Sequence, residues 1–265
     1  MTPDSRTIYV ANSGSGTVTP IDTATARAAP PIPVGSDPVA LAVTPDGRTV
    51  YVANEGSDTV TPIDTVTGRP RAPIPVGAGQ RTIAVTPDGG TAYVLDWAGG
   101  TVTPIDTATD TAGPPIGVGS FPSAIAVSPR GGIAYVASYG SDTVTPISAA
   151  TQTADAAIPA GYVPDALVIT PNGREVYVVD GNSDEITPAN SISGTVTPLA
   201  TASGRAGPPI SVGLYSYPTA LAVTGSTAVV LDTYAGQVSL INTRTRQVFA
   251  PVTVGNFPEA VAIST

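Results

Sequence analysis

The stretch that decides the fold reads Val43-Thr44-Pro45-Asp46-Gly47-Arg48-Thr49-Val50-Tyr51-Val52-Ala53-Asn54, because variants of it return along the chain at a step of 42 residues. Its turn element is Thr-Pro-Asp at 2–4, 44–46 and 86–88, Ser-Pro-Arg at 128–130 and Thr-Pro-Asn at 170–172. Its tyrosine recurs as Tyr9, Tyr51, Tyr93, Tyr135 and Tyr177. A period of this length is typical of supersecondary units that bury their apolar faces only by stacking on one another.

Each repeat contains four short runs of strand-forming residues separated by turn residues. In the second repeat these runs are Val39 to Thr44, Thr49 to Ala53, Thr59 to Ile63, and Ala72 to Val76. The third run, Thr-Val-Thr-Pro-Ile, begins at Thr17, Thr59, Thr101 and Thr143, then at Thr195 after 10 extra residues, and in degenerate form at Gln237. Four strands in about 42 residues are typical of a propeller blade. The sequence therefore predicts an all-β protein, a six-bladed β-propeller of four-stranded antiparallel blades.

The two ends of the chain predict that the ring closes. Residues 258–264, Pro-Glu-Ala-Val-Ala-Ile-Ser, match the first strand of a repeat, Pro38 to Thr44, whereas residue 1 lies just beyond the place of such a strand. We expect the C-terminal strand to complete the first blade, since closure pairs two strand edges that would otherwise be exposed. Residues 1–265 would then form a single propeller domain. The alternative is a seven-bladed ring that has lost one repeat.

The composition limits the chemistry. Glycine and proline number 28 each, 42% of the residues are hydrophobic, His and Cys are absent, and all 11 basic residues are Arg. Disulfides, thiolate nucleophiles, Cys/His zinc sites, Ser-His-Asp triads and Schiff-base lysines are excluded. An enzyme of this composition needs Asp, Glu or Tyr as acid and base. The use of Arg alone, with abundant Ala, Gly and Pro, is typical of a bacterial gene of high GC content.

Charge and hydropathy exclude two classes of partner. The net charge of -9 disfavours nucleic acid, whose phosphates need clustered positive charge. No apolar run approaches the roughly 18 residues of a membrane helix, and Met1-Thr2-Pro3-Asp4 does not resemble a signal peptide. We expect a soluble protein without membrane insertion. The compartment stays open between the cytoplasm and secretion with a leader removed.

The repeat resembles a known family. Tyr51-Val52-Ala53-Asn54, preceded by Val43 to Gly47 and followed by Asp58 to Asp64, is similar to the YVTN repeat of bacterial β-propellers, and the resemblance covers nearly the whole chain. It implies a propeller of the superfamily that includes lactonase-like, lyase-like and cell-surface proteins. Because fold does not determine function and this chain has no histidine, no catalytic residue is carried over from the resemblance.

Aromatic side chains gather in one set of loops. We call the face with the turns between second and third strands, and with the crossovers into the next blade, the top; the other turns lie on the bottom. Eight of the 14 aromatic residues fall in top loops: Trp97, Phe121, Tyr139, Tyr162, Tyr215, Tyr217, Tyr234 and Phe257. We expect them to wall a small-molecule site at the top mouth of the central channel. Alternatively, an aromatic residue before proline, such as Phe121, Tyr217 or Phe257, packs the crossover.

The same face carries unusual charges at the start of the innermost strand. The aligned residues are Val39, Arg81, Ser123, Asp165, Thr219 and Glu259. If the protein is an enzyme, we expect lyase, cyclase or lactone-opening chemistry, with Glu259 or Asp165 as base and Arg81 stabilising developing negative charge. The alternative is a plain ion pair between Arg81 and a carboxylate. Whether the protein is an enzyme stays open at this point.

A second aligned set ends the second strand: Asn12, Asn54, Asp96, Ser138, Asp180 and Asp232. Asp96 and Asp232 are candidate ligand-binding residues, although Asn and Asp at this place are typical of side chains that bond the following turn. No metal or cofactor is predicted, with calcium bound by several of these oxygens as the alternative. The insertion at about 181–192 lengthens a top loop of the fifth blade and is either a lid or surface drift.

Two further functions compete with a small-molecule site. A non-catalytic module would present the same aromatic residues to a protein or a glycan, because Tyr and Trp are common anchors at interfaces. A purely structural repeat of a larger surface protein would show no binding that depends on Trp97 or Glu259.

Overall fold

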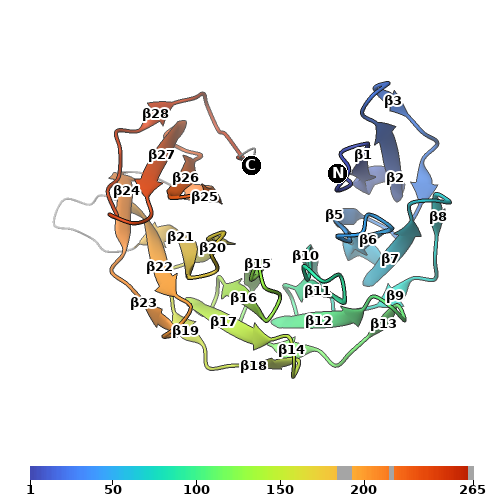
Figure 1. Ribbon diagram of the computed structural model, residues 1–265, viewed down its shortest axis with the longest axis horizontal. Coiled ribbons are helices and arrows are strands. Elements are labelled where there is room, and N and C mark those ends of the chain that lie inside the picture. Colours follow the sequence, from blue (N-terminus) through green and yellow to red (C-terminus); the bar gives the residue numbers. More distant parts are fainter. Residues whose placement is uncertain (184–192, 215–217, 262–265) are drawn as a thin grey trace. The chain divides into compact units, whose positions relative to one another are not determined.

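The computed structural model describes residues 1–183, 193–214 and 218–261. It contains six antiparallel sheets of four or five strands, one for each repeat (Figure 1). Two short 3-10 turns, η1 (Ser13–Ser15) and η2 (Glu55–Ser57), are the helical elements of the described part of the chain. The prediction of an all-β, six-bladed propeller is confirmed.

The strands follow the repeat. The first three blades consist of β1 (Thr7–Asn12), β2 (Thr17–Asp22), β3 (Arg27–Ala28) and β4 (Ile32–Pro33); β5 (Pro38–Val43), β6 (Thr49–Asn54), β7 (Thr59–Asp64), β8 (Arg69–Pro70) and β9 (Ile74–Pro75); and β10 (Gln80–Val85), β11 (Thr91–Asp96), β12 (Thr101–Asp106), β13 (Thr111–Ala112) and β14 (Ile116–Gly117). The other three consist of β15 (Pro122–Val127), β16 (Ile133–Ser138), β17 (Thr143–Ser148), β18 (Thr153–Ala154) and β19 (Ile158–Pro159); β20 (Pro164–Ile169), β21 (Glu175–Ser183), β22 (Ser193–Ala200), β23 (Arg205–Ala206) and β24 (Ile210–Leu214); and β25 (Pro218–Thr224), β26 (Thr227–Asp232), β27 (Gln237–Asn242) and β28 (Val252–Thr253).

The fourth strand differs from the prediction. A continuous strand from Ala72 to Val76 was expected, but blade two has two short segments, β8 and β9, which pair with opposite ends of β7. The segments flank residues 71–73, where the chain leaves the sheet. Pro73 lies in this interruption and has no N–H to donate to a ladder. Proline is not required for it, because blade four breaks at the same place, at residues 155–157 between β18 and β19, without a proline there.

The strand register places the turns as predicted. In blade two Pro38 lies opposite Asn54, Asn54 opposite Thr59, and Thr59 opposite Pro75. The turn after β6 and the crossover after β9 therefore share one end of the blade, the top. Val43 pairs with Val50 at the other end. The top loops of each blade therefore emerge together.

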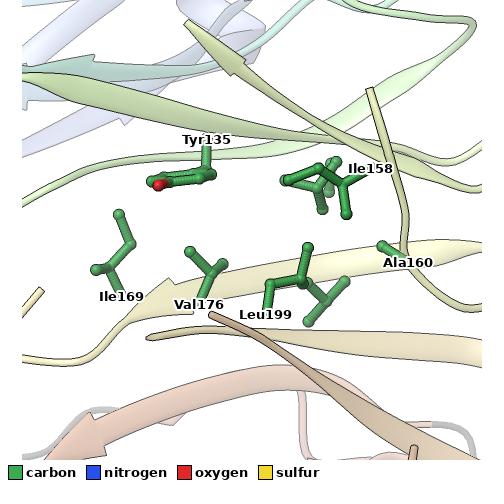
Figure 2. Close-up of a cluster of buried hydrophobic side chains, with 9 residues drawn as sticks. Tyr135, Ile158, Ala160, Ile169, Val176 and Leu199 are labelled. Atoms are coloured by element: carbon green, nitrogen blue, oxygen red, sulfur yellow. The ribbon is translucent and has the colours of Figure 1, made fainter. Parts of the chain in front are cut away.

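Apolar side chains join neighbouring blades. Between blades four and five, Tyr135 and Ile158 face Ile169, Val176 and Leu199, all of them buried (Figure 2). Similar clusters join blades one and two, two and three, and five and six. Full burial of one such side chain contributes about 1.5 to 3 kcal/mol. These clusters hold the blades in the positions from which their top and bottom loops project.

The chain falls into two compact units of three blades each. The first comprises residues 1–122 and 150–153, and the second comprises residues 123–149 and 154–265. Each unit is described by itself below. The single domain over residues 1–265 stays a prediction.

The first blade has no innermost strand among the described residues. Its sheet consists of β1 to β4, and residues 258–261 are in no strand. Ile8 and Val10 of β1 are each 39% exposed, whereas their counterparts in β6, Val50 and Val52, are fully buried. The closing strand, which extends into residues 262–265 outside the described part, stays a prediction. In the described part of the chain, no helix is long and apolar enough to cross a membrane.

Candidate functional site

The top of blade three brings three of the predicted residues together. Trp97 follows β11, and its backbone N–H donates to the Gly79 carbonyl at 2.9 Å, which ties the turn to the crossover that enters the blade. The guanidinium carbon of Arg81 lies 5.1 Å from the centroid of the Trp97 ring. Phe121 also packs against Trp97: the two ring centroids are 4.6 Å apart, and the ring planes are inclined by 34°. Arg81, Trp97 and Phe121 are called the aromatic cluster below.

Arg81 has free donors in this arrangement. Its side chain is exposed, and no carboxylate of the described residues lies within ion-pair distance. A guanidinium above an aromatic face is attracted by the ring quadrupole. Its N–H groups lie in the guanidinium plane and point outward from it, so they can still donate hydrogen bonds. The plain ion pair considered for Arg81 therefore does not occur within the first unit.

Backbone strain sets the direction of Phe121. The residue just before the first strand adopts a left-handed conformation, with φ of 53° at Asp37, 51° at Phe121, 55° at Val163 and 51° at Phe257. This conformation is uncommon for residues other than glycine and costs about 1 kcal/mol or more for bulky ones. Only blade three has a glycine here, Gly79. Since the crossover geometry requires the conformation, an aromatic residue there is directed against the neighbouring top turn.

The second unit holds the other described aromatic residues of the top loops. Tyr234 and Phe257 form an edge-to-face pair with centroids 6.3 Å apart, and they are 69% and 65% exposed. Tyr139 and Tyr162 are also exposed. Tyr215 and Tyr217 lie outside the described residues, as does the insertion beyond residue 183.

The predicted catalytic residues are divided between the units. Arg81 belongs to the first unit, whereas Asp165 and Glu259 belong to the second. Glu259 is exposed and Asp165 is half-buried. Their joint action at one site stays a prediction.

The aligned set that ends the second strand lies inside the blades. Asn54 donates through Nδ2 to the Thr59 carbonyl at 3.1 Å and to Thr61 Oγ1 at 3.0 Å. In blade three the roles reverse, and Asp96 Oδ2 accepts from Thr103 Oγ1 at 2.6 Å and from Thr101 Oγ1 at 3.2 Å. Both side chains are fully buried. The threonines of the third strand thus satisfy either an amide or a carboxyl group.

Burial shifts the acidity of these carboxyl groups. Desolvation raises the pKa of Asp96 to about 6, although the hydroxyl donors Thr103 and Thr101 act in the opposite sense. Asp180 accepts from Thr195 and Thr197 at 2.8 and 2.7 Å, and desolvation raises its pKa to about 7. In each carboxyl group the second oxygen, Oδ1, is buried without a hydrogen-bond partner among the described residues.

The described members of this set make hydrogen bonds within their own blades, and the ligand-binding role of Asp96 and Asp232 stays a prediction. Asp96 and Asp232, expected among the ligand-binding residues, are buried, and Asp232 Oδ1 accepts from the backbone N–H of Ala235 at 2.9 Å. The side chains turn into their own blades, and no group of three or more acidic residues in the described part of the chain could hold a metal ion.

Sequence reasoning missed a feature of the opposite face. Arginine-lined cavities lie at the bottom of the second unit, among turns to which no function was assigned. The signal that could have revealed them is the change from Asp4, Asp46 and Asp88 to Arg130 and Asn172 at one repeat position.

A family model described as "Lactonase, 7-bladed beta-propeller" matches residues 41–212, more than half of the chain. The chain belongs to the Lactonase family. The family description names seven blades, whereas this Lactonase-family chain has six sheets in its described part. No curated protein matches the chain significantly.

Three solved structures share the fold of this Lactonase-family chain. The hydrazine synthase of Kuenenia stuttgartiensis is 23% identical, with a TM-score of 0.81 over 98% of this chain and 87% of that one. A functionally unknown protein from Desulfotomaculum acetoxidans is 17% identical, with a TM-score of 0.74 over 97% and 86%. The computationally designed Ika8 protein is 16% identical, with a TM-score of 0.79 over 98% and 76%. At these identities the similarity concerns the fold alone.

Proposed function

We propose that this Lactonase-family propeller binds a small cyclic molecule that carries a carboxylate or an ester carbonyl at the aromatic cluster. The observation that carries the proposal is the exposed Arg81 guanidinium, free of ion pairs in the described part of the chain, held 5.1 Å above the Trp97 ring beside Phe121. Aromatic walls with a few convergent polar groups are typical of small-molecule sites.

The chemistry of the cluster favours an oxygen ligand with a flat body. The edge of the guanidinium presents two parallel N–H groups, which match the two oxygens of a carboxylate. The Trp97 and Phe121 rings supply apolar surface for a ring system beside that anchor. Such a site would bind the acid product of lactone opening as well as the lactone itself.

Lactone hydrolysis is the reaction that the family membership adds to this proposal. A base removes a proton from water, the water oxygen attacks the ring carbonyl, the acyl C–O bond breaks, and the released alkoxide takes a proton to give a hydroxy acid. Arg81 would stabilise the negative charge on the carbonyl oxygen. For the base of this reaction the sequence predicts Asp165 or Glu259.

The single tryptophan makes the test direct. Trp97 is the only tryptophan of the chain, so its fluorescence reports on the cluster without a label. The protein is titrated with phthalide, an aromatic lactone, and with its ring-opened acid, 2-(hydroxymethyl)benzoate, and isothermal calorimetry checks each curve. We expect saturable quenching, and about tenfold weaker binding of the acid by Arg81→Gln, which corresponds to about 1.4 kcal/mol.

Arg48→Gln, on the bottom turn of blade two, is the matched control and should leave binding unchanged. Uptake of base during incubation with phthalide measures hydrolysis, and Glu259→Gln and Asp165→Asn show whether either carboxylate is the base. Equal affinity of wild type and Arg81→Gln would contradict the site. Binding without hydrolysis of any lactone would restrict the function to binding.

A second function is favoured by one observation in the other unit. Tyr234 and Phe257 are more than 60% exposed and form an edge-to-face pair. Exposed aromatic pairs of this kind serve as anchors at interfaces. We propose a non-catalytic contact with a protein or a glycan as the alternative, tested on a glycan array with Tyr234→Ala and Phe257→Ala. Loss of binding in both variants, with the Trp97 titration unaffected, would support it.

A further inference from the structure

Corresponding cavities on the bottom face have opposite charge in the two units. In the first unit, a cavity of about 320 Å³ between blades one and two is lined by Asp4, Arg6 and Asp46. The repeat places Arg130 and Asn172 at the two aspartate positions in the second unit, where a cavity of about 450 Å³ lies between blades four and five. The second unit has therefore lost both carboxylates and gained a cation at the same place in the fold.

A neighbouring cavity extends this positive surface. It has a volume of about 590 Å³, lies between blades five and six, and is lined by Asn172, Arg174, Arg244 and Arg246 among others. Asn172 and Arg174 line both cavities of the second unit. One carboxylate, Glu175, contributes to the two linings, against the four arginines 130, 174, 244 and 246. We call this surface the arginine face.

At the position of Asn172 the carboxylate is replaced without a change in the hydrogen bonds of the turn. Asp46 Oδ1 accepts from Thr44 Oγ1 at 2.6 Å and from the Arg48 backbone N–H at 3.0 Å. Asn172 Oδ1 accepts from Thr170 Oγ1 at 2.8 Å and from the Arg174 backbone N–H at 2.9 Å. The amide oxygen of Asn172 therefore accepts the same two hydrogen bonds as the carboxylate of Asp46, and the turn differs only in lacking the negative charge.

The turn that carries Arg244 and Arg246 shows the same replacement. Asp64 Oδ1 accepts from the Thr67 backbone N–H at 2.7 Å, and Asn242 Oδ1 accepts from the backbone N–H groups of Arg244 and Thr245 at 3.0 and 3.1 Å. Two independent turns beside one cavity thus use asparagine where the first unit uses aspartate. An anion in this cavity avoids the repulsion that both aspartates would cause.

One arginine of the face is held rigidly while others are free. Arg246 lies 5.2 Å above the Tyr177 ring and bonds to Glu175, and its Nη1 is buried without a hydrogen-bond partner in the described part of the chain. Arg174 and Arg244 are exposed and make no ion pair with any described residue. The free guanidinium groups are therefore available to a ligand, beside one whose position is set by its own blade.

We propose that the arginine face binds a small molecule with two or more oxyanion groups, phosphates or carboxylates. Guanidinium groups bind both kinds of oxyanion in a bidentate manner, and two cavities that share Arg174 suit a ligand with more than one charged group. The site lies at the bottom of the second unit, whereas the aromatic cluster lies at the top of the first, so the two proposals stand independently.

The test restores the charge of the first unit without disturbing the fold. Pyrophosphate and citrate are titrated into the full-length protein by isothermal calorimetry at low salt, with wild type, Asn172→Asp and Asn242→Asp. Each substitution places the repeat's own aspartate in a turn whose hydrogen bonds it already fits. We expect saturable binding of at least one probe by wild type and at least tenfold weaker binding by each variant, with unchanged thermal midpoints without ligand.

Asp46→Asn and Asp64→Asn, the reverse changes in the first unit, are the matched controls and should bind as wild type. A preference for pyrophosphate identifies phosphate as the ligand group, and a preference for citrate identifies carboxylate. Arg174→Gln combined with Arg244→Gln should abolish binding. The proposal is overturned if neither probe binds wild type, or if the two aspartate variants bind as tightly as wild type does.

Discussion

A single buried position shows how the repeat tolerates two chemistries. Asn54 and Asp180 occupy corresponding places, both fully buried and both bonded to threonines of the third strand. The amide is neutral at every pH, whereas the carboxyl group must lose a proton inside the blade. The environment is the same, so the exchange of one atom decides whether stability depends on pH.

The first prediction concerns Asp180. Its pKa rises from the usual 3.8 to about 7 on folding, so the folded state holds the proton more tightly than the unfolded chain does. The resulting stability is fully present below pH 4 and is lost as the pH rises to about 7. Asp180→Asn should remove this loss and raise the free energy of unfolding at pH 8 by roughly 2 to 4 kcal/mol. Urea denaturation between pH 4 and pH 9 measures it.

The reciprocal substitution is the control. Asn54→Asp should introduce the same pH dependence into blade two, where wild type has none from this position. Parallel pH profiles for wild type and Asp180→Asn would contradict the assignment of a buried, protonated carboxyl group.

At the scale of elements, the crossover between blades depends on close packing over the strand ends. A Cβ at Gly77 would lie 2.6 Å from Asp96 Cγ, because the crossover passes directly over that buried side chain. The corresponding Gly35 lies equally close to Asn54. Only glycine therefore fits at residue 77 without displacing a neighbouring side chain. The same crossover continues to Gly79, whose carbonyl accepts a hydrogen bond from the Trp97 N–H.

The second prediction follows from this contact. Gly77→Ala should destabilise the protein by about 1 to 3 kcal/mol, because the rigid carboxyl group must move to admit a methyl group. Gly14→Ala is the matched control, since a Cβ there meets no atom within 4 Å, and its effect should stay within about 0.5 kcal/mol. Thermal unfolding of both variants measures the difference, and equal midpoints would contradict the packing argument.

The repeat tyrosines Tyr51 and Tyr177 connect neighbouring blades through their hydroxyl groups. In the first unit the Tyr51 hydroxyl donates to Asp110 Oδ1 at 2.7 Å, and Asp110 Oδ2 pairs with Arg71 Nη1 at 2.9 Å. Desolvation, together with the Asp110 carboxylate, raises the pKa of Tyr51, so the hydroxyl remains a donor. In the second unit Arg246 occupies the corresponding turn position and stacks on Tyr177 instead.

The third prediction separates the two bonds of Asp110. Asp110→Ala should cost about 1 to 3 kcal/mol, because the buried Tyr51 hydroxyl loses its bond to Asp110 and keeps only the Thr107 carbonyl, at 3.4 Å, as an acceptor. Asp110→Asn keeps an acceptor oxygen and loses only the partly exposed ion pair with Arg71, so its cost should stay below about 1 kcal/mol. Urea denaturation ranks the variants, and a larger loss in the Asn variant would show that the ion pair dominates.

At the scale of the whole molecule, the open question is the edge of β1. In the described residues this strand pairs with β2 on one side only, and Ile8 and Val10 are partly exposed. An unpaired strand edge exposes backbone donors and promotes association with other chains. The match between residues 258–264 and the first strand of a repeat predicts what covers this edge.

The fourth prediction tests that closure. Amide hydrogen exchange is measured by NMR in the full chain and in a chain lacking residues 258–265. If the C-terminal strand completes blade one, amides on the unpaired side of β1 exchange slowly in the full chain and rapidly in the shortened one. Amides of β6, which already lies between β5 and β7, should be protected in both. Rapid exchange of the β1 edge in the full chain would contradict closure.

The order of the residues is enough to predict the number of blades, the order of their strands and the face on which each loop emerges. These properties follow from the 42-residue period, from the alternation of apolar and polar residues within strands, and from the turn residues between them. All of these signals lie between residues that are close in the sequence. The sequence also placed Arg81, Trp97 and Phe121 on one face, without their contacts. The sequence did not predict the interruption of the fourth strand, which occurs in blade four without a proline at residues 155–157.

The burial of polar groups and the contacts between charges became apparent from the three-dimensional fold. Asp96 and Arg81 both end up on the top side of blade three, yet one is enclosed by threonines and a glycine while the other lies open over Trp97. Asn172 and Arg244, 72 positions apart, line one cavity. Burial and electrostatic interaction depend on distance through space, which the spacing of residues along a chain does not specify.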